Sequence, residues 1–333
     1  MTKLNEAEVV DLFVRLKRDN FTSEDKDDVV VIPIKKIGKL SERSIVVLKS
    51  DMLVESTDVP KAMRPWQIAR KSIVACVSDL AAKGIKSPYI CLISLGIPPK
   101  YSTDDILDLV KGFGLASKEF DVKIVGGDTN RSEELVINCN MFAISDSSKQ
   151  IPKRKGAKPG DHVIISGQFG YPAAGLKILT GKVSSTDKFR QDATSSVLIP
   201  KPQQRFGISL AKYFSSSIDS SDGLAISLYE LATTSKIDLL IDTSPSARGV
   251  KQFAADNKIG LNELVFYGGE EYEIVATISP RNLKRAKALA RRLKVKLHVI
   301  GIAREGSGKV YVLNRMGQYS ILGKFGYVHQ FDL

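Results

Sequence analysis

Six short acidic clusters in the sequence contain the residue types that bind metal ions. Each combines Asp or Glu with Ser, Gly or a second acidic residue, beside an apolar segment. The clusters are Asp27-Asp28, Ser50-Asp51, Ser78-Asp79, Gly126-Gly127-Asp128-Thr129, Asp219-Ser220-Ser221-Asp222-Gly223 and Gly268-Gly269-Glu270-Glu271. Mg²⁺ prefers carboxylate, water and phosphate oxygens as ligands. The clusters therefore indicate metal-assisted chemistry on phosphates, in which bound cations reduce the repulsion between two anionic groups.

Taken singly, most of these clusters also have an ordinary structural explanation. Asp128 could form a turn, and Asp222-Gly223 could form a turn or cap a helix. Asp79 is harder to explain in this way, because it lies in the apolar stretch 73–82. An unpaired ionised carboxylate would be costly there. Either a bound cation or a pairing Lys or Arg side chain would remove that cost.

Several common catalytic motifs are missing from the sequence. It contains no G-x-x-x-x-G-K-[ST], no G-x-G-x-x-G and no C-x-x-C, so P-loop and dinucleotide sites are not supported. The three histidines, His162, His298 and His329, are not paired at metal-ligand spacing, which argues against a zinc site or a His-dependent triad. Any chemistry must therefore depend on carboxylates, hydroxyls, backbone amides and lysines.

Length and charge narrow the classes of protein further. A chain of 333 residues favours two domains, and the polar segment 145–161, rich in Lys with Gly and Pro, is the predicted boundary. The net charge of +12 suggests either an anionic partner, nucleic acid or a phosphorylated small molecule, or simply a solvated Lys-rich surface. No apolar run approaches the roughly 20 residues of a membrane span.

The three cysteines, Cys76, Cys91 and Cys139, are far apart and flanked by apolar residues. We expect them to be buried thiols in a protein of a reducing compartment, without a disulfide. The first 16 residues lack the basic-then-apolar order of a signal peptide.

Hydrophobic periodicity predicts mixed helices and strands in both halves, as in α/β or α+β domains. Helices are predicted at 4–18, 65–83, 103–119, 171–179 and 281–294. Strands are predicted at 29–34, 45–48, 89–97, 135–144, 162–167, 271–278 and 297–303. Residues 123–131 are predicted to be a strand leading into a glycine turn, and residues 215–235 a strand, a sharp turn and a helix.

The order and spacing of the motifs resemble those of the thiamine-monophosphate kinase family, in the superfamily of aminoimidazole ribonucleotide synthetase. The resemblance covers nearly the whole chain. The segments that carry it are SDMLVES (50–56), SIVACVSDLAAKG (72–84), IVGGDTNRS (124–132), KRKGAKPGD (153–161), YPAAGLKIL (171–179), IDSSDGL (218–224) and YGGEEYEI (267–274).

This resemblance implies a two-domain fold of the α/β and α+β classes. Residues 1–150 would form an ATP- and metal-binding domain whose strands build a β-barrel with a second subunit, giving a homodimer. Residues 151–333 would form an α+β sandwich that completes the nucleotide and substrate cleft. The expected location is cytoplasmic, with no membrane partner.

The activity implied by the resemblance is direct, in-line transfer of the ATP γ-phosphoryl group to thiamine monophosphate, assisted by several Mg²⁺ ions and without a protein nucleophile. The metal ligands would be Asp28, Ser50, Asp51, Asp79, Asp128, Asp219 and Asp222. The nucleotide would contact Gly127, Asp128, Arg154 and Ser221. The thiamine phosphate would contact Glu270 and Tyr327, and Asp58 occupies a further substrate-contacting position.

Five positions depart from the family pattern. Lys26 stands in place of Gly, Lys49 of Thr, Asp58 of His, Cys76 of Asn and Glu271 of Asp. Asp58 and Lys26 bear on the acceptor side, so the acceptor is less determined than the metal and ATP sites.

Three alternatives therefore stay open. The first is another ATP-dependent enzyme of the superfamily with a different small acceptor. The second is a basic nucleic-acid-binding protein using the helix at 281–294, although a solvated helix face is the favoured explanation of its charge and no aromatic residues are interleaved there to stack on bases. The third is a non-catalytic relative.

Overall fold

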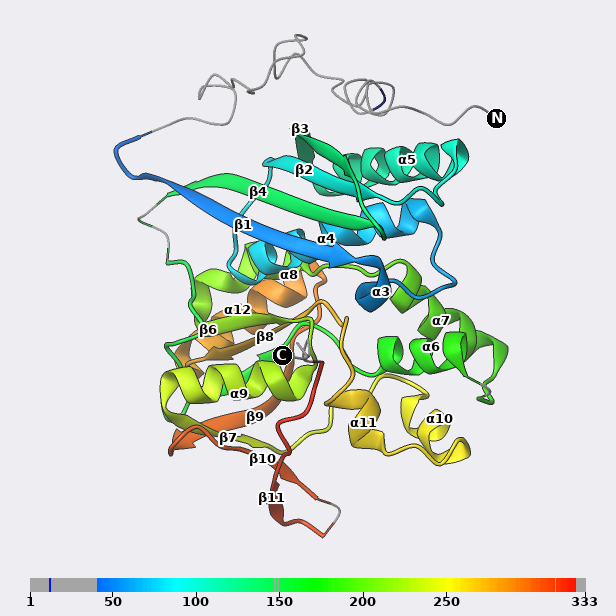
Figure 1. Cartoon of the computed structure of the whole chain (residues 1–333). Coiled ribbons are helices and arrows are strands. Elements are labelled where there is room, and N and C mark those ends of the chain that lie inside the picture. Colours follow the sequence, from blue (N-terminus) through cyan, green and yellow to red (C-terminus); the bar gives the residue numbers. More distant parts are fainter. Residues whose placement is uncertain are drawn as a thin grey trace. The chain divides into compact units, whose positions relative to one another are not determined.

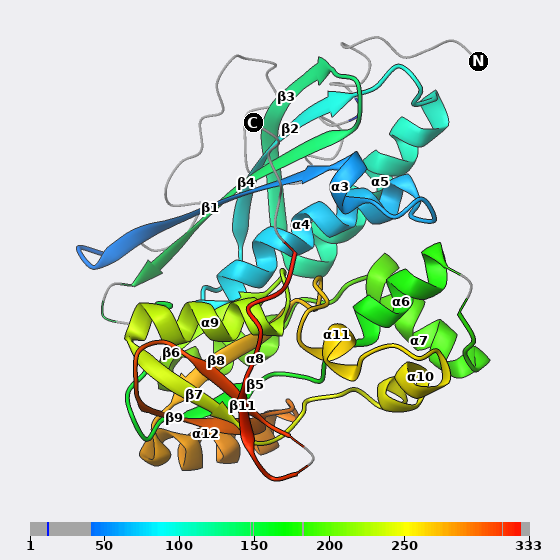
Figure 2. The same ribbon diagram turned by 60° about the horizontal axis from the view of Figure 1, so that its bottom comes forward.

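The computed structural model describes Leu12 and residues 41–146, 148, 150–181, 183–314 and 316–327 (Figures 1 and 2). The chain forms two compact units. The first comprises Met1–Leu80 and Ile85–Lys149, and the second comprises Ala81–Gly84 and Gln150–Leu333. The roles that the resemblance assigns to the two halves stay predictions. The predicted helix at 4–18, the predicted strand at 29–34, Lys26 and Asp28 lie outside the described residues.

The first unit is built on a four-stranded sheet with the strand order β1-β4-β2-β3. β4 runs antiparallel to both β1 and β2, whereas β2 and β3 are parallel and are joined through α5. The strands are β1 (Ser44–Val54), β2 (Tyr89–Ile97), β3 (Val122–Arg131) and β4 (Val136–Asp146). The helices are α3 (Glu55–Asp58), α4 (Pro65–Ala82) and α5 (Thr103–Phe120).

Alternation along β1 gives this sheet two different faces, because successive side chains of a strand point to opposite sides. One face carries Lys49 and Asp51, in register with Met141 and Cys139 of β4, which are buried. α4 and α5 lie together on one side of the sheet (Figure 2). The other face is exposed and apolar along β1, where Val46, Leu48 and Met52 are 64%, 76% and 61% exposed.

An ion pair between the buried Arg70 of α4 and the exposed Glu119 of α5 links the two helices. Two N–H groups of Arg70, on Nε and Nη2, donate to the Glu119 carboxylate at 2.8 and 2.7 Å, which is the strong two-bond geometry for an arginine and a carboxylate. The Arg70 guanidinium also lies 5.1 Å from the centre of the Phe120 ring. At the other end of the contact, the backbone N–H of Trp66 donates to Asp108 of α5. These two contacts hold α4 against α5.

The second unit is built on a seven-stranded sheet with the strand order β11-β10-β7-β9-β5-β8-β6. Its strands are β5 (His162–Ile165), β6 (Phe214–Ser220), β7 (Ile237–Ile241), β8 (Glu273–Ile278), β9 (His298–Glu305), β10 (Val310–Leu313) and β11 (Tyr319–Ile321). Its helices are α6 (Tyr171–Thr180), α7 (Asp187–Leu198), α8 (Gln204–Leu210), the 3₁₀ helix Ala211–Tyr213, α9 (Leu224–Ser235), α10 (Val250–Asp256), α11 (Leu261–Val265) and α12 (Pro280–Leu293).

Helices cover both faces of this sheet, with α9 and α12 on opposite sides (Figure 2). Along β5, Val163 and Ile165 enter the core beneath α9, whereas Ile164 enters the core beneath α8 and α12. The short apolar runs of β5 and β8 therefore follow from burial on both faces. β6 ends at Ser220 and α9 begins at Leu224. The loop between them consists of Ser221, Asp222 and Gly223.

Most elements predicted from periodicity in the described residues are confirmed, with small shifts at their ends. The predicted glycine turn at 126–128 is wrong, because β3 continues through it to Arg131 and pairs with β2. Gly127 permits this pairing, since a Cβ atom there would overlap the carbonyl oxygen of Ile93. The prediction missed β7, β10 and β11 and the short helices α7, α8, α10 and α11. Within the described residues both sheets are open.

Two further expectations concern composition. All three cysteines are free and buried, as predicted.

In α12, Leu283, Ala286 and Ala290 are buried, while all the Lys and Arg side chains between Arg281 and Lys294 are exposed, so the basic residues form a solvated face. Among the described helices, none combines the length and the apolar character that crossing a membrane requires.

The contact between α4 and α5 predicts a large cost for adding one methyl group at Gly112. Intrinsic propensity alone would favour Gly112→Ala in α5 by up to about 1 kcal/mol. The new Cβ would, however, overlap the backbone of Trp66, including its carbonyl oxygen, and overpacking of this kind costs about 1–3 kcal/mol. Denaturant unfolding should therefore show a net loss of stability. The control Lys111→Ala, at an exposed position of the same helix, should change stability by less than about 0.5 kcal/mol.

Candidate active site

In the first unit, a lysine and two of the predicted aspartates form a cluster of charges. The ammonium nitrogen of Lys49 lies 3.2 Å from Asp51 Oδ2 and 2.5 Å from Asp79 Oδ2. The three side chains are 27% to 32% exposed. The cost of placing Asp79 in an apolar helix is therefore reduced by a pairing lysine, one of the two possibilities left open by the sequence.

The fold brings these residues together through two local patterns. Lys49 and Asp51 are two positions apart on β1, so both side chains lie on the same face of the sheet. Asp79 lies in the last turns of α4, whose Cys76 Sγ donates to the carbonyl oxygen of Cys139 on β4. Since Cys139 is the register partner of Asp51, the last turns of α4 reach the strand positions that carry the lysine and the first aspartate.

Burial and charge act in opposite directions on this cluster. Burial lowers the pKa of Lys49, but Asp79 and Asp51 outweigh it and hold that pKa above its ordinary value. Burial raises the pKa of Asp51, against the opposing effect of Lys49. Lys49 is therefore fully charged at neutral pH, and its charge is what allows the two carboxylates to approach each other.

Ser50 and Asp128 lie away from this cluster. Ser50 is on the opposite face of β1, and its hydroxyl donates to Asn138 of β4 at 3.1 Å. Asp128 is exposed on β3 and is the register partner of Ser94, which is in turn paired with Asn138. By register, Asp128 therefore shares a face with Ser50, not with Asp51. Gly127 precedes it at the point where β3 approaches the Ile93 carbonyl most closely.

Two other predicted site residues have partners that explain their positions locally. Asp58 at the end of α3 accepts a hydrogen bond from the Val54 N–H at 2.7 Å, and its carbonyl oxygen accepts one from the buried Lys71 ammonium. Arg154 in the second unit lies 3.4 Å from Glu230 of α9 and is about half exposed. Both residues stay predictions as ligand contacts.

In the second unit, the structure brings together predicted residues from three distant segments. The loop between β6 and α9 carries Ser221 and Asp222, and the N–H of Glu270 donates to the Ser221 carbonyl oxygen at 2.5 Å. The N–H of Tyr327 donates to the Asp222 carbonyl oxygen at 3.0 Å. Asp219, at the buried end of β6, lies two residues before Ser221. Asp219, Ser221 and Asp222 thus lie on one stretch of chain to which Glu270 and Tyr327 are hydrogen-bonded.

Backbone conformation shows that this arrangement is constrained. Glu270 and Tyr272 have φ values of 63° and 52°, a left-handed region that residues other than glycine seldom adopt. The Tyr272 N–H donates to the Ser220 carbonyl oxygen at 2.9 Å, so hydrogen bonds on both sides hold the strained segment. Strain of this kind costs on the order of 1–3 kcal/mol per residue and clusters at functional sites.

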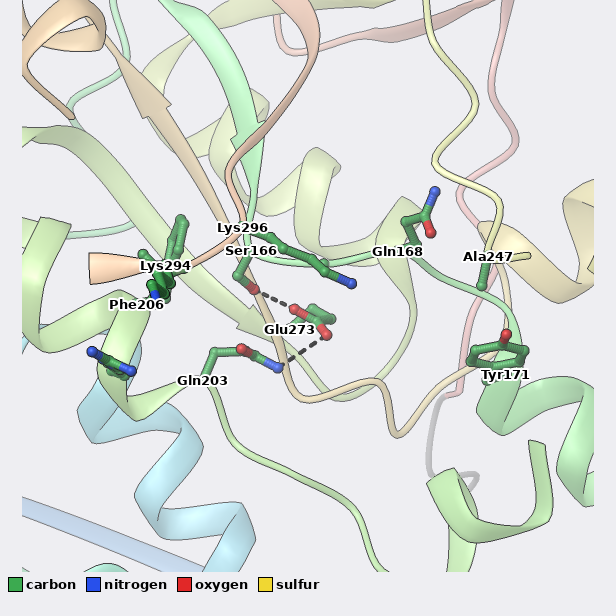
Figure 3. Close-up of a pocket in the computed structure, with 12 residues that line it drawn as sticks. Ser166, Gln168, Tyr171, Gln203, Phe206, Ala247, Glu273, Lys294 and Lys296 are labelled. Carbon is green, nitrogen blue, oxygen red and sulfur yellow. Dashed lines mark hydrogen bonds between the residues drawn. The ribbon is translucent and has the colours of Figure 1, made fainter. Parts of the chain in front are cut away.

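A cavity of about 480 Å³ in the second unit contains a partly buried glutamate, Glu273, that the sequence-based prediction missed (Figure 3). Glu273 accepts hydrogen bonds there from the Ser166 hydroxyl and from Gln203, with Lys296 beside it (Figure 3). Burial raises the pKa of Glu273 to about 7, although Ser166, Lys296 and Gln203 oppose the shift. The sequence feature that could have identified Glu273 is its position three residues after Glu270, at the start of β8.

The oxygen donors of the predicted ligand set suit a hard divalent cation. Asp51 and Asp79 present carboxylates that already share one cationic group. Next to Asp219, the buried hydroxyl of Ser220 has no hydrogen-bond partner among the described residues. Over that same part of the chain, no group of three or more Asp, Glu, His and Cys side chains gathers closely enough to hold a metal ion.

Comparison with known proteins places these features in a family. Residues 26–145 match the model of the family described as AIR synthase related protein, N-terminal domain. The thiamine-monophosphate kinase of Nitrosopumilus maritimus (strain SCM1) is 40% identical over 310 residues, covering 93% of this chain and 94% of that protein. The chain belongs to the thiamine-monophosphate kinase family.

Solved structures show the same fold. The crystal structure of the thiamine-monophosphate kinase from Stenotrophomonas maltophilia K279a has a TM-score of 0.77 and 24% identity, covering 93% of this chain and 97% of that chain. A solved structure described as AaThiL complexed with AMPPCP and TMP has a TM-score of 0.76 and 23% identity, covering 99% of each chain. The mixed α/β architecture of the thiamine-monophosphate kinase family is therefore present in this chain.

The described departures from the thiamine-monophosphate kinase pattern all have partners inside their own unit. Lys49 pairs with two aspartates, and Cys76 donates to the Cys139 carbonyl oxygen. Asp58 accepts from Val54, and the buried carboxylate of Glu271 accepts from the Gly170 N–H at 2.5 Å. Each of these four side chains thus has a hydrogen-bond or ion-pair partner within its own unit.

Glu273 predicts a specific pH dependence of stability for this thiamine-monophosphate kinase homologue. Because its pKa is raised from 4.5 to about 7, the folded state binds more protons than the unfolded state between these values. The free energy of unfolding should therefore fall as pH rises through this range, by at most about 3–4 kcal/mol. Glu273→Gln removes the carboxyl group whose titration causes this loss. The stability of the variant relative to wild type should therefore be greater at pH 8 than at pH 5.

Denaturant unfolding at the two pH values measures this effect. Glu263→Gln, at an exposed position of α11 in the same unit, controls for the removal of one charge. Equal differences between Glu273→Gln and wild type at both pH values would contradict the prediction.

Proposed function

We propose that this protein is an ATP-dependent kinase that phosphorylates thiamine monophosphate to thiamine diphosphate, with ADP as the second product. The observation that carries the proposal is the adjacency of Asp219, Ser221, Asp222, Glu270 and Tyr327 in the second unit. Membership of the thiamine-monophosphate kinase family supports it. So does the fold shared with a protein solved with AMPPCP, an ATP analogue, and TMP.

We assign roles to the residues from their adjacency in the second unit and from the charges of their side chains. Ser221 and Arg154 would bind the nucleotide phosphates, together with the backbone amides of Gly127 and Asp128. Glu270 would face the phosphate of the acceptor, Tyr327 would stack on its rings, and Asp58 would lie on the acceptor side. Tyr327 suits this role because it is about half exposed while its backbone is tied to Asp222.

Magnesium is the cation that we propose for the acidic residues. The ligands would be Asp28, Ser50, Asp51, Asp79, Asp128, Asp219 and Asp222, with Asp51 and Asp79 using the carboxylate oxygens that do not contact Lys49. Bound Mg²⁺ would supply neutralisation of charge between two phosphates and alignment for in-line transfer. The protein itself would supply fixed positions, since no nucleophilic side chain is needed when a phosphate oxygen attacks. The strained Glu270 segment is a rigid element suited to that task.

The two units would divide these tasks. We propose that residues 1–150 form the ATP- and metal-binding domain with the surface for a second copy of the chain, and that residues 151–333 complete the nucleotide and substrate site with further metal, nucleotide and acceptor contacts. We also infer a cytoplasmic location, because the three cysteines are free and buried thiols.

A direct assay tests the activity. Purified protein with ATP, Mg²⁺ and thiamine monophosphate should give thiamine diphosphate and ADP in equal amounts, and omission of Mg²⁺ should stop both. Asp79→Asn should nearly abolish turnover, because it removes the carboxylate charge next to Lys49, while circular dichroism should show an unchanged fold. Release of ADP without thiamine diphosphate, or faster turnover on another small phosphate, would contradict the proposed acceptor.

We propose further that the protein is a homodimer that pairs through the exposed face of β1. Val46, Leu48 and Met52 form an apolar row on that face, and exposed apolar patches mark interaction surfaces. Val46→Asp places a charge in the row and should convert a dimer to monomers in analytical ultracentrifugation. Leu107→Asp, at an exposed apolar position on α5, is the control and should stay dimeric. A monomeric wild-type protein would refute this arrangement.

A further inference from the structure

We propose that the Lys49 ammonium group is a permanent cation of the phosphate-transfer site and takes the place of one divalent cation at Asp51 and Asp79. The inference rests on the proposed function for its meaning in catalysis. Its structural part, that the lysine and a metal ion are alternatives as the bridge between the Oδ2 atoms of these two carboxylates, stands on the geometry alone.

The geometry shows direct competition for the same atoms. The ammonium nitrogen contacts the Oδ2 atom of both carboxylates, at 3.2 and 2.5 Å. Mg²⁺ binds oxygen at 2.0–2.1 Å, so an ion bridging these two oxygens would occupy the space that the ammonium group now fills. A metal ion can bridge Asp51 and Asp79 at these atoms only if the lysine side chain moves away.

The surroundings keep the lysine in this position. Lys49 and Asp51 lie on the same strand face, where β1 is hydrogen-bonded to β4 along its whole length. The helix that carries Asp79, α4, is held against α5 by the two hydrogen bonds from Arg70 to Glu119. All three charged groups are partly buried, so they are screened by solvent less than a surface pair would be.

Charge counting indicates what the lysine does. The two ionised carboxylates carry two negative charges, and the ammonium group compensates one of them. A lysine ammonium has three hydrogen-bond donors, and the two aspartates take up two, which leaves a third for a phosphate oxygen. Unlike a bound ion, this cation does not dissociate, so the Asp51–Asp79 pair stays neutralised to the same extent at any Mg²⁺ concentration.

Metal binding by the protein without nucleotide tests this assignment. Mn²⁺ serves as the probe, and its stoichiometry is measured by isothermal titration calorimetry and by the electron paramagnetic resonance signal of free Mn²⁺. Lys49→Thr should bind one additional Mn²⁺ per chain compared with wild type. Lys49→Arg, which keeps the positive charge, should keep the wild-type stoichiometry. Lys123→Thr controls for the loss of one positive charge in the same unit, on β3, and should also match wild type.

Thermal unfolding gives a second readout. The melting temperature of wild type should differ less between chelator and Mg²⁺ than that of Lys49→Thr. The reason is that the cation at Asp51 and Asp79 in wild type is a side chain of the protein itself. Lys49→Thr should melt at a lower temperature in the chelator, since two carboxylates then face each other uncompensated, and Mg²⁺ or Mn²⁺ should restore much of the loss. Lys49→Met, which retains an apolar stem of similar length, repeats the test if the threonine variant packs poorly.

The outcomes separate the inference from the proposed kinase activity. An unchanged Mn²⁺ stoichiometry in both neutral variants, or variants that remain unfolded at millimolar Mn²⁺, would overturn the role of Lys49 even in an active kinase. An additional Mn²⁺ in those variants would support it even if the protein phosphorylated a different acceptor, because neither ATP nor thiamine monophosphate is present in the measurement.

Discussion

The sharing of one ammonium group by two carboxylates is the interaction on which the first unit depends. Without Lys49, the negative charges of Asp51 and Asp79 would face each other at the partly buried contact between a strand and a helix. Like charges in such surroundings repel strongly, because less water lies between them. The position of α4 on the sheet, the exposure of Asp79 and the charge presented to a ligand therefore all depend on this contact.

The second unit solves a different problem, which is to hold polar backbone in an unusual conformation. Its loop after β6 has few helix or sheet partners of its own, so the segments around Glu270 and Tyr327 provide hydrogen bonds across the chain. Gly223 is part of this solution. Its φ of 114° suits glycine, and the carbonyl oxygens of Phe266, Tyr267 and Gly268 lie close to where a side chain would begin.

Local sequence pattern was sufficient for much of the fold and for only part of the site. Pro65 and Gly84 mark the ends of α4 well, because these residues act on the helix next to them. The sequence could state that Asp79 needed a compensating charge, but not that Lys49 supplied it, since thirty residues separate them. Gly126-Gly127 looked like a turn because glycine favours turns, whereas here it permits close strand pairing. The short helices α10 and α11 carry too few turns for a periodic signal.

Strand β1 has a consequence for how the chain must fold. Its inward residues include Lys49 and Asp51, and its outward residues include Val46, Leu48 and Met52. A slip of one residue in its pairing with β4 would exchange these two sets. Lys49 and Asp51 would then lie on the exposed face, and the apolar row would lie on the face toward α4. Among the described strands, β1, with eleven residues, lies at an edge of its sheet, and long apolar edges are templates for aggregation. The strand that carries the cationic lysine is thus also the part of the unit where misfolding would be most damaging.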